Sequence, residues 1–202
     1  ICGGDNGIYI LTLIHRLEKP LISILHTILK EPSYVQRIII REIAEQSSKI
    51  IVMSQRAVEF LTTIYDIPVE KIQIIEHGVP DLEEPESNPV KQLSSFKKHR
   101  VLLTFGLISR NKGLEIVVKA LPAIAAKHPD VMYVVLGNTH PGVIKNSGEE
   151  YRDHLKSLAA KLNVSNHLTF INQFVSEEEL INYLTAAEVY VTPYHNEAQI
   201  TS

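Results

Sequence analysis

"TFGLISRNKG", residues 104–113, joins an apolar stretch to an amphipathic one, and this junction decides the fold. The apolar run "RVLLTF" (100–105) is typical of a buried strand. The residues "KGLEIVVKALPAIAAKH" (112–128) repeat apolar side chains at helical spacing: Leu114, Val117, Leu121 and Ile124. A strand, a turn that contains glycine and a helix, in this order, indicate a parallel sheet with crossover helices.

The same alternation extends to both sides of this junction. Further strands are expected over 20–26, 49–54, 71–80, 131–137, 168–171 and 188–194. Helices are expected between them, over 35–47, 55–66, 147–162 and 176–187. The sequence therefore predicts an α/β protein with Rossmann-like parallel sheets.

Polar side chains mark the expected start of three helices. Ser54 stands directly before one of them and is expected to be its N-cap. Ser147 with Glu150, and likewise Ser176 with Glu179, have the spacing of a capping box, in which each residue bonds the other's backbone N–H.

The stretch "DLEEPESNPVKQLSSFKKHR", residues 81–100, interrupts the alternation. It contains two prolines and three serines, begins acidic and ends basic, which is the composition of a linker. We therefore expect one Rossmann-like domain over 1–82, a linker over 83–99 and a second Rossmann-like domain over 100–202.

The composition of the 202 residues is that of an ordinary globular protein, with 45% hydrophobic and 21% charged residues. The net charge of −3 argues against a nucleic-acid partner, which would need a positive surface. Apolar runs stay shorter than the roughly 20 residues that span a bilayer. The chain begins at Ile1, and we expect it to be an internal piece of a longer protein.

The side chains that usually bind metals are few or dispersed. The nine histidines include no H-x-x-x-H pair, and no Asp-x-Asp occurs, so no metal and no cofactor are expected. Cys2 is the single cysteine, which excludes an intrachain disulfide and indicates a reducing compartment. A cytoplasmic location follows, either free or at the membrane periphery.

The turn that contains Gly106 has the chemistry to bind a diphosphate. Ligands of doubly wound sheets collect at the carboxyl ends of strands, where Gly106 lets a ligand approach the backbone. The next helix offers unpaired N–H groups, and Arg110 and Lys112 add two positive charges. A solvated turn with two surface cations explains the same spacing equally well. The turn matches neither the P-loop nor the G-x-G-x-x-G fingerprint.

Five segments occur in an order that resembles one enzyme family: "IEHGVP", "FGLISRNKGLEIVVKALP", "HPDVMYVVLG", "LTFINQF" and "EELINYLTAAEVYVTPY". The chain is similar to group-one glycosyltransferases, the retaining enzymes with two Rossmann-like domains called GT-B. The resemblance covers nearly the whole chain and implies that both domains are incomplete here. It also implies transfer of a hexose from a nucleotide diphosphate sugar to an acceptor hydroxyl, without a metal.

The resemblance assigns the donor diphosphate to the turn. The family's Gly-Arg-x-x-x-x-Lys-Gly segment is matched here by Gly106, Lys112 and Gly113. Leu107 stands where the family has its arginine, and we expect Arg110 to substitute for it. The departure at Leu107 puts the arginine's role in doubt and leaves Lys112 as the firmer match.

Other expected site residues follow strands. By resemblance, Glu197 matches the first of two glutamates that contact the donor, although a loop-exposed acid is the alternative. His26 follows an apolar strand, and the resemblance implies that it faces the donor sugar and acceptor; the alternative is that it caps a helix or bonds to a carbonyl. By the same resemblance, the backbone of Phe170 to Gln173 is expected to face the nucleobase. Asn138 lies either in the donor cleft or in a simple turn.

Two other functions remain open at this point. Sugar phosphorylases and nucleotide-sugar epimerases share paired Rossmann-like domains, and they release different products. A non-catalytic module that binds nucleotide sugars is favoured by Leu107 in place of the family arginine.

Overall fold

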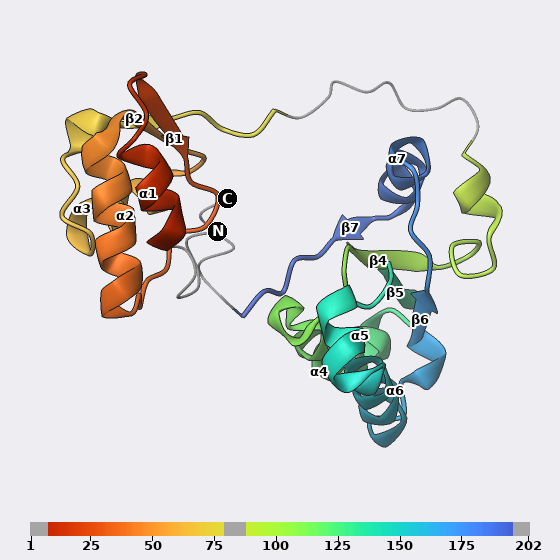
Figure 1. Cartoon of the computed structure of the whole chain (residues 1–202). Coiled ribbons are helices and arrows are strands. Elements are labelled where there is room, and N and C mark those ends of the chain that lie inside the picture. Colours follow the sequence, from red (N-terminus) through yellow and green to blue (C-terminus); the bar gives the residue numbers. More distant parts are fainter. Residues whose placement is uncertain (1–7, 79–87, 196–202) are drawn as a thin grey trace. The chain divides into compact units, whose positions relative to one another are not determined.

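The computed structural model describes residues 8–78 and 88–195. The chain divides into two compact units after Pro80. We call the described parts of these units the first unit (8–78) and the second unit (88–195). Figure 1 shows each unit as a small sheet with helices packed against it.

The first unit contains a parallel sheet in the order β1-β2-β3. Its strands are β1 (Leu21–Ile24), β2 (Ser47–Val52) and β3 (Ile72–Ile74), and its α-helices are α1 (Tyr9–Ile14), α2 (Tyr34–Gln46) and α3 (Gln55–Thr63). Two of these helices begin at serine caps. Ser33 forms a capping box with Gln36, and the Ser54 hydroxyl accepts from the Ala57 N–H, as the sequence predicts for Ser54.

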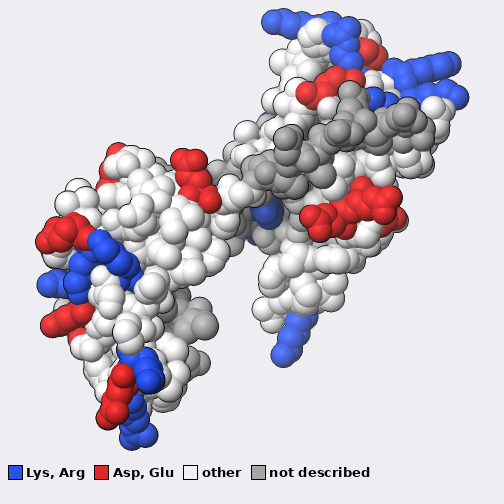
Figure 2. Space-filling model, turned by 90° about the horizontal axis from the view of Figure 1, so that it is seen from above, with Lys and Arg blue, Asp and Glu red and all other residues white. Residues whose placement is uncertain are grey.

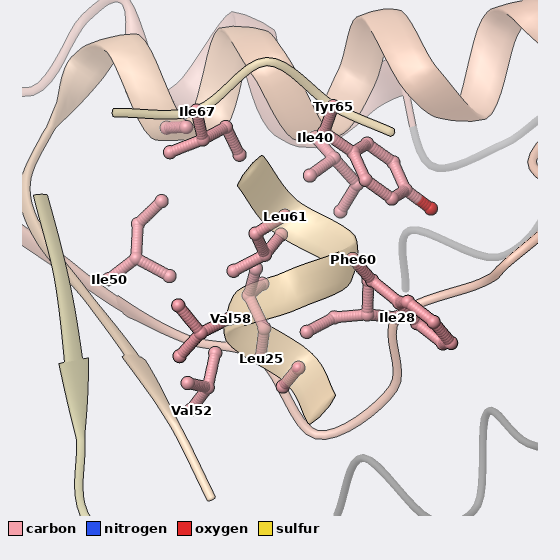
Figure 3. Packing of buried hydrophobic residues seen from close by; sticks show 12 residues of the cluster. Leu25, Ile28, Ile40, Ile50, Val52, Val58, Phe60, Leu61, Tyr65 and Ile67 are labelled. Atoms are coloured by element: carbon pink, nitrogen blue, oxygen red, sulfur yellow. The ribbon is translucent and has the colours of Figure 1, made fainter. Parts of the chain in front are cut away.

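The core of the first unit lies between β2, α2 and α3. Figure 3 shows apolar side chains from these elements and from the segment after β1 converging on one another. Ile50, Val52 and Leu61 have no exposed surface. Burying each such side chain stabilises the fold by about 1.5–3 kcal/mol. Ile50 and Val52, which alternate along β2, therefore hold the sheet against α2 and α3.

The second unit contains a parallel sheet in the order β6-β5-β4-β7. Its strands are β4 (Arg100–Phe105), β5 (Val131–Leu136), β6 (Leu168–Ile171) and β7 (Val189–Tyr190). Its α-helices are α4 (Leu114–Lys127), α5 (Pro141–Ser147), α6 (Glu150–Lys161) and α7 (Glu177–Ala186). Helix α4 runs through Pro122 and buries Leu114, Val117 and Leu121, as the helical spacing predicts.

Two hydrophobic cores lie on opposite faces of this sheet. On one face, side chains of α4 and α6 pack against Val131, Tyr133 and Val135 of β5. On the other face, α7 and the segment before β4 pack against the alternate β5 residues. Every residue of β5 is buried, which is the pattern of a central strand covered on both sides.

The capping box expected at Ser147 is wrong. Ser147 ends α5, and α6 begins at Glu150 after Glu149, whose side chain makes no cap hydrogen bond. Gly148 between them has φ +58° and ψ −137°, a conformation that glycine adopts far more readily than other residues, and it separates the two helices. The capping box of Ser176 with Glu179 is confirmed at the start of α7.

Three further stretches differ from their expected secondary structure. The strand expected over 71–80 covers only Ile72–Ile74 among the described residues. The last strand covers Val189–Tyr190 rather than 188–194, and it pairs only with Leu102 and Leu103 of β4. In the expected linker, Val90 and Phe96 are buried in the second unit's core beside α7. The residues from Asn88 onward therefore pack as part of the second unit.

Charges of both signs occur on the surface of each unit in the face shown in Figure 2. No helix among the described residues is long and apolar enough to cross a membrane.

Candidate functional site

The carboxyl ends of β4, β5 and β6 are joined by backbone hydrogen bonds. The Gly106 N–H donates to the Leu136 carbonyl at 3.0 Å, and the Gly137 N–H donates to the Ile171 carbonyl at 2.9 Å. Beyond them, the Ile108 N–H donates to the Asn138 carbonyl at 2.9 Å. The turn after β4 and the turn after β5 therefore run side by side.

Two glycines allow these turns to lie this close. Gly137 has φ +134°, and a Cβ on it would lie 2.2 Å from the Gly106 carbonyl oxygen. Gly106 has φ +118°, and a Cβ on it would lie 3.6 Å from Lys112 Nζ. The backbone at the end of β4 therefore carries no side chain at Gly106, and it faces the ammonium group of Lys112.

Lys112 is half-buried and is held from the segment after β7. Its Nζ donates to the Tyr194 hydroxyl at 2.8 Å and lies 4.3 Å from the centroid of that ring. A Cβ on Gly113 would lie 2.1 Å from the Pro193 carbonyl oxygen, so this segment touches the turn directly. Lys112 therefore lies between Gly106 and the segment that follows β7.

Arg110 is held in a different direction. Its Nη2 donates to Glu150 Oε1 at the start of α6, and its guanidinium lies 5.3 Å from the centroid of the Tyr151 ring. Its side chain is 56% exposed. The structure therefore places Arg110 and Lys112 on one turn, but with different partners.

Helix α4 begins beside this turn with its first N–H groups partly satisfied. The Tyr151 hydroxyl accepts from the Leu114 N–H at 3.0 Å and donates to Glu115 Oε2. His195 Nε2 lies 2.7 Å from Glu115 Oε1. Glu115 thereby links α4, α6 and the segment after β7.

The pKa values of this cluster follow from its contacts. Burial acts to raise the pKa of Glu115, but hydrogen bonds from Tyr151 and His195 outweigh it, so the pKa lies below the ordinary value. Burial raises the pKa of Tyr151, and the neighbouring Glu115 carboxylate raises it further. Glu115 is therefore ionised at neutral pH, and Tyr151 stays a hydrogen-bond donor.

Replacing Tyr151 with phenylalanine is expected to lower the free energy of unfolding of the second unit by about 2 kcal/mol. The change leaves the buried Leu114 N–H without its acceptor. The control is Tyr133→Phe, because the Tyr133 partner Thr104 keeps its own bond to the Val191 carbonyl. This control is expected to cost about 1 kcal/mol. Denaturant unfolding measures both, and equal losses would contradict the role of the Leu114 N–H.

The three residues expected in the donor cleft lie after β5 and in or after β6. Asn138 is half-buried beside Ile108. Phe170 is half-buried, with its ring centroid 5.1 Å from the Arg152 guanidinium. Gln173 is exposed, and its Nε2 lies 3.4 Å from the Tyr183 hydroxyl.

The two residues expected to act on the sugar are placed differently. His26 belongs to the first unit, where its exposed ring stacks on His77 with centroids 5.7 Å apart. Glu197 lies outside the described residues. Their roles remain predictions.

Sequence reasoning missed several residues of this site. Tyr194 accepts the hydrogen bond of Lys112, and Glu115 contacts His195. Arg152 is buried beside the turns that follow β5 and β6. Tyr194 lies far from Lys112 in the sequence, so no local pattern could reveal their contact. Among the described residues, no group of His, Cys, Asp and Glu is suited to hold a metal ion.

A family model described as glycosyl transferases group 1 matches residues 87–199, more than half of the chain. The chain belongs to this family. The region that matches the family model lies almost entirely in the second unit, which contains Gly106, Arg110 and Lys112.

The chain is also similar to known proteins over part of their length. The chain is 37% identical to spore coat protein SA of Bacillus subtilis over 92 residues, which are 46% of this chain and 23% of that protein. It is 26% identical to D-inositol 3-phosphate glycosyltransferase of Mycobacterium sp. (strain KMS) over 161 residues, which are 78% of this chain and 34% of that protein.

Solved structures show the same fold. The crystal structure of Anabaena HepE in complex with UDP and glucose superposes with a TM-score of 0.75 at 18% identity, covering 91% of this chain and 49% of that one. The expected α/β fold of GT-B type with Rossmann-like sheets is thereby confirmed. The chain spans about half the length of HepE and about a third or less of the length of the two sequence relatives. The activity of the whole protein is therefore a proposal.

Proposed function

We propose that the whole protein transfers a hexose from a nucleotide diphosphate sugar to an acceptor hydroxyl, with retention of configuration. Family membership supports glycosyl transfer, and the HepE structure, which holds UDP and glucose, supports a nucleotide-sugar donor. In the reaction, the bond from the anomeric carbon to the diphosphate breaks, a bond to the acceptor oxygen forms, and the acceptor proton passes to the leaving phosphate.

The observation that carries this proposal is the position of Lys112. Its ammonium group lies at the carboxyl end of β4, beside the bare backbone of Gly106 and close to the start of α4. Ligands of doubly wound sheets bind at this edge, and helix starts attract anions. Lys112 is suited to neutralise the charge that builds up on a leaving diphosphate, an electrostatic effect that usually dominates catalysis.

The remaining residues take supporting roles in this proposal. Arg110 donates a hydrogen bond to Glu150 in this structure. To bind the diphosphate, it has to break this bond and donate to phosphate oxygens instead. Asn138, Phe170 and Gln173 are assigned to the donor side. The proposal needs no metal ion, in keeping with a positively charged side chain at the diphosphate.

Glu197 is assigned to orient the donor sugar and His26 to lie on the acceptor side. A neutral imidazole can donate a hydrogen bond to charge that develops on the sugar. The exposed position of the His26 ring in the first unit is compatible with contact to a ligand.

A non-catalytic module that binds nucleotide sugars is the second candidate. Two observations favour it, namely Leu107 in place of the family arginine and the engagement of Arg110 by Glu150. In such a module, Lys112 and the start of α4 would bind the donor without transfer.

The test uses the whole protein with a panel of UDP-, GDP- and ADP-sugars. Donor binding is measured as a rise in melting temperature, because a ligand that binds the native state stabilises it. Turnover is then assayed in two reactions. A nucleotide sugar with candidate acceptors is assayed for free nucleoside diphosphate, and candidate glycosides with inorganic phosphate are assayed for sugar phosphate. Release of nucleoside diphosphate supports the transferase, and release of sugar phosphate supports a phosphorylase. Binding without either product supports the module, and no binding contradicts the proposal.

A further inference from the structure

Arg152 is a charged residue in an unusual place. It lies in the first turn of α6, and only 4% of its surface is exposed. Arginine is almost never buried to this degree unless it is paired. It lies on the buried face of α6, together with Tyr151, Leu155 and Ala159.

The guanidinium of Arg152 joins three parts of the second unit. Its Nε donates to Glu149 Oε2 at 3.0 Å, just before α6. Its Nη2 donates to the Gly137 carbonyl at 3.2 Å and to Thr139 Oγ1 at 3.3 Å, in the turn after β5. The same nitrogen lies 2.8 Å from Asn172 Oδ1, after β6.

One face of this guanidinium covers Phe170, whose ring centroid lies 5.1 Å from Cζ. Thr139 is itself held by Glu149, since its hydroxyl donates to Oε2 at 2.5 Å. One planar group thus fixes the carboxyl ends of two neighbouring strands with respect to each other. A planar fork of donors is suited to this task, and a lysine ammonium is not.

The pairing of Arg152 is incomplete. Among the described residues, its Nη1 is buried and has no hydrogen-bond partner. Its acidic partner Glu149 has 41% of its side chain exposed, so the buried charge is only partly compensated. Buried ion pairs are weak contributors to stability, and an apolar side chain in their place is often as stable. Stability alone is therefore a poor reason for an arginine at this position.

We infer that Arg152 is a positioning residue for the donor site, holding the turns after β5 and β6 in one fixed arrangement. This inference rests on the proposed function, which assigns Asn138 of the turn after β5 and Phe170 of β6 to the donor side. Arg152 acts through these neighbours, since its guanidinium lies beneath the turns and is enclosed by them. The site it serves is the donor half, where small displacements of binding groups weaken both affinity and rate.

The test compares Arg152→Lys with Asn172→Ala and a control. Arg152→Lys keeps the charge but loses the planar set of guanidinium donors, so the lysine can bond to one turn and not to both. Asn172→Ala removes only the hydrogen bond between Arg152 and the turn after β6. Asn172 is exposed, which favours normal folding of this variant. The control is Arg100→Lys, an exposed ion-paired arginine at the opposite, amino end of β4.

Hydrogen exchange is the readout that requires no ligand. In Arg152→Lys, exchange over 137–140 and 171–173 is expected to rise together by about ten-fold, while the rest of the second unit stays unchanged. Asn172→Ala is expected to raise exchange over 171–173 alone, and Arg100→Lys neither. A rise in one turn only for Arg152→Lys, or a rise spread over the whole unit, would overturn the inference.

Nucleotide affinity is the second readout, measured well below the melting temperature with UDP, GDP and ADP as probes. For the nucleotide that binds wild type best, the Kd is expected to rise about ten-fold in Arg152→Lys, with KM for its sugar rising more than kcat falls. An unchanged Kd in a destabilised variant indicates a purely structural role and overturns the inference. If wild type binds none of the three, the proposed function fails, and hydrogen exchange then decides only whether Arg152 holds the two turns together.

Discussion

Replacing Lys112 with methionine is expected to lower kcat/KM for the nucleotide sugar by on the order of 10²-fold. The ammonium group lies beside the backbone of Gly106 at the end of β4, where the diphosphate is proposed to bind. Removing one preorganised charge from such a site typically costs two to three powers of ten, or about 3–4 kcal/mol. The rate of release of nucleoside diphosphate measures this effect.

Methionine is the informative replacement because it keeps the length and most of the volume of the side chain. The fold loses the hydrogen bond to the Tyr194 hydroxyl and the contact of the charge with that ring. These contacts amount to about 1–2 kcal/mol at a half-buried position. The variant should therefore still fold and melt about 4–16 °C below wild type, while donor binding is largely lost.

Lys119→Met is the matched control. Lys119 is an exposed residue of α4, and its replacement changes the net charge by the same amount. Its kcat/KM is expected to stay within about two-fold of wild type, because an exposed charge away from the site is screened. Equal losses in both variants would point to net charge rather than to Lys112. No loss in either variant would remove the turn of residues 104–113 from the proposed site.

The sequence could predict the fold because its signals are local. The apolar run of β4 and the helical spacing in α4 lie within a few residues of each other, so periodicity alone reveals them. Likewise, Ser176 and Glu179 are one helical turn apart, and their capping box is confirmed. The box expected at Ser147 failed because the conformation of Gly148, one residue later, separates two helices there.

The site was less predictable because its contacts join distant parts of the chain. Gly106 and Lys112 could be found from their place after a strand and before a helix. The Tyr194 hydroxyl that holds Lys112 and the Gly137 carbonyl that holds Arg152 could not. Such pairs depend on the order of strands in the sheet, where β7 follows β4 in space but not in sequence.

Replacing Gly137 with alanine is expected to lower the free energy of unfolding of the second unit by about 3–5 kcal/mol. A Cβ at this position would lie 2.2 Å from the Gly106 carbonyl oxygen, which is backbone and cannot rotate away. The φ angle of +134° adds strain for any residue with a Cβ. For a unit of about 100 residues, each kcal/mol lowers the melting temperature by about 4–8 °C, so the loss exceeds 10 °C.

Gly148→Ala separates the two causes of this loss. Gly148 also has a positive φ, +58°, but no atom of the described residues lies within 4 Å of a Cβ built there. Its replacement carries the backbone strain alone, which is expected to be about 1–3 kcal/mol. If Gly137→Ala costs no more than Gly148→Ala, the turns after β4 and β5 do not need their close approach. If it costs several kcal/mol more, the contact between Gly106 and Gly137 is a fixed feature of the edge where the diphosphate is proposed to bind.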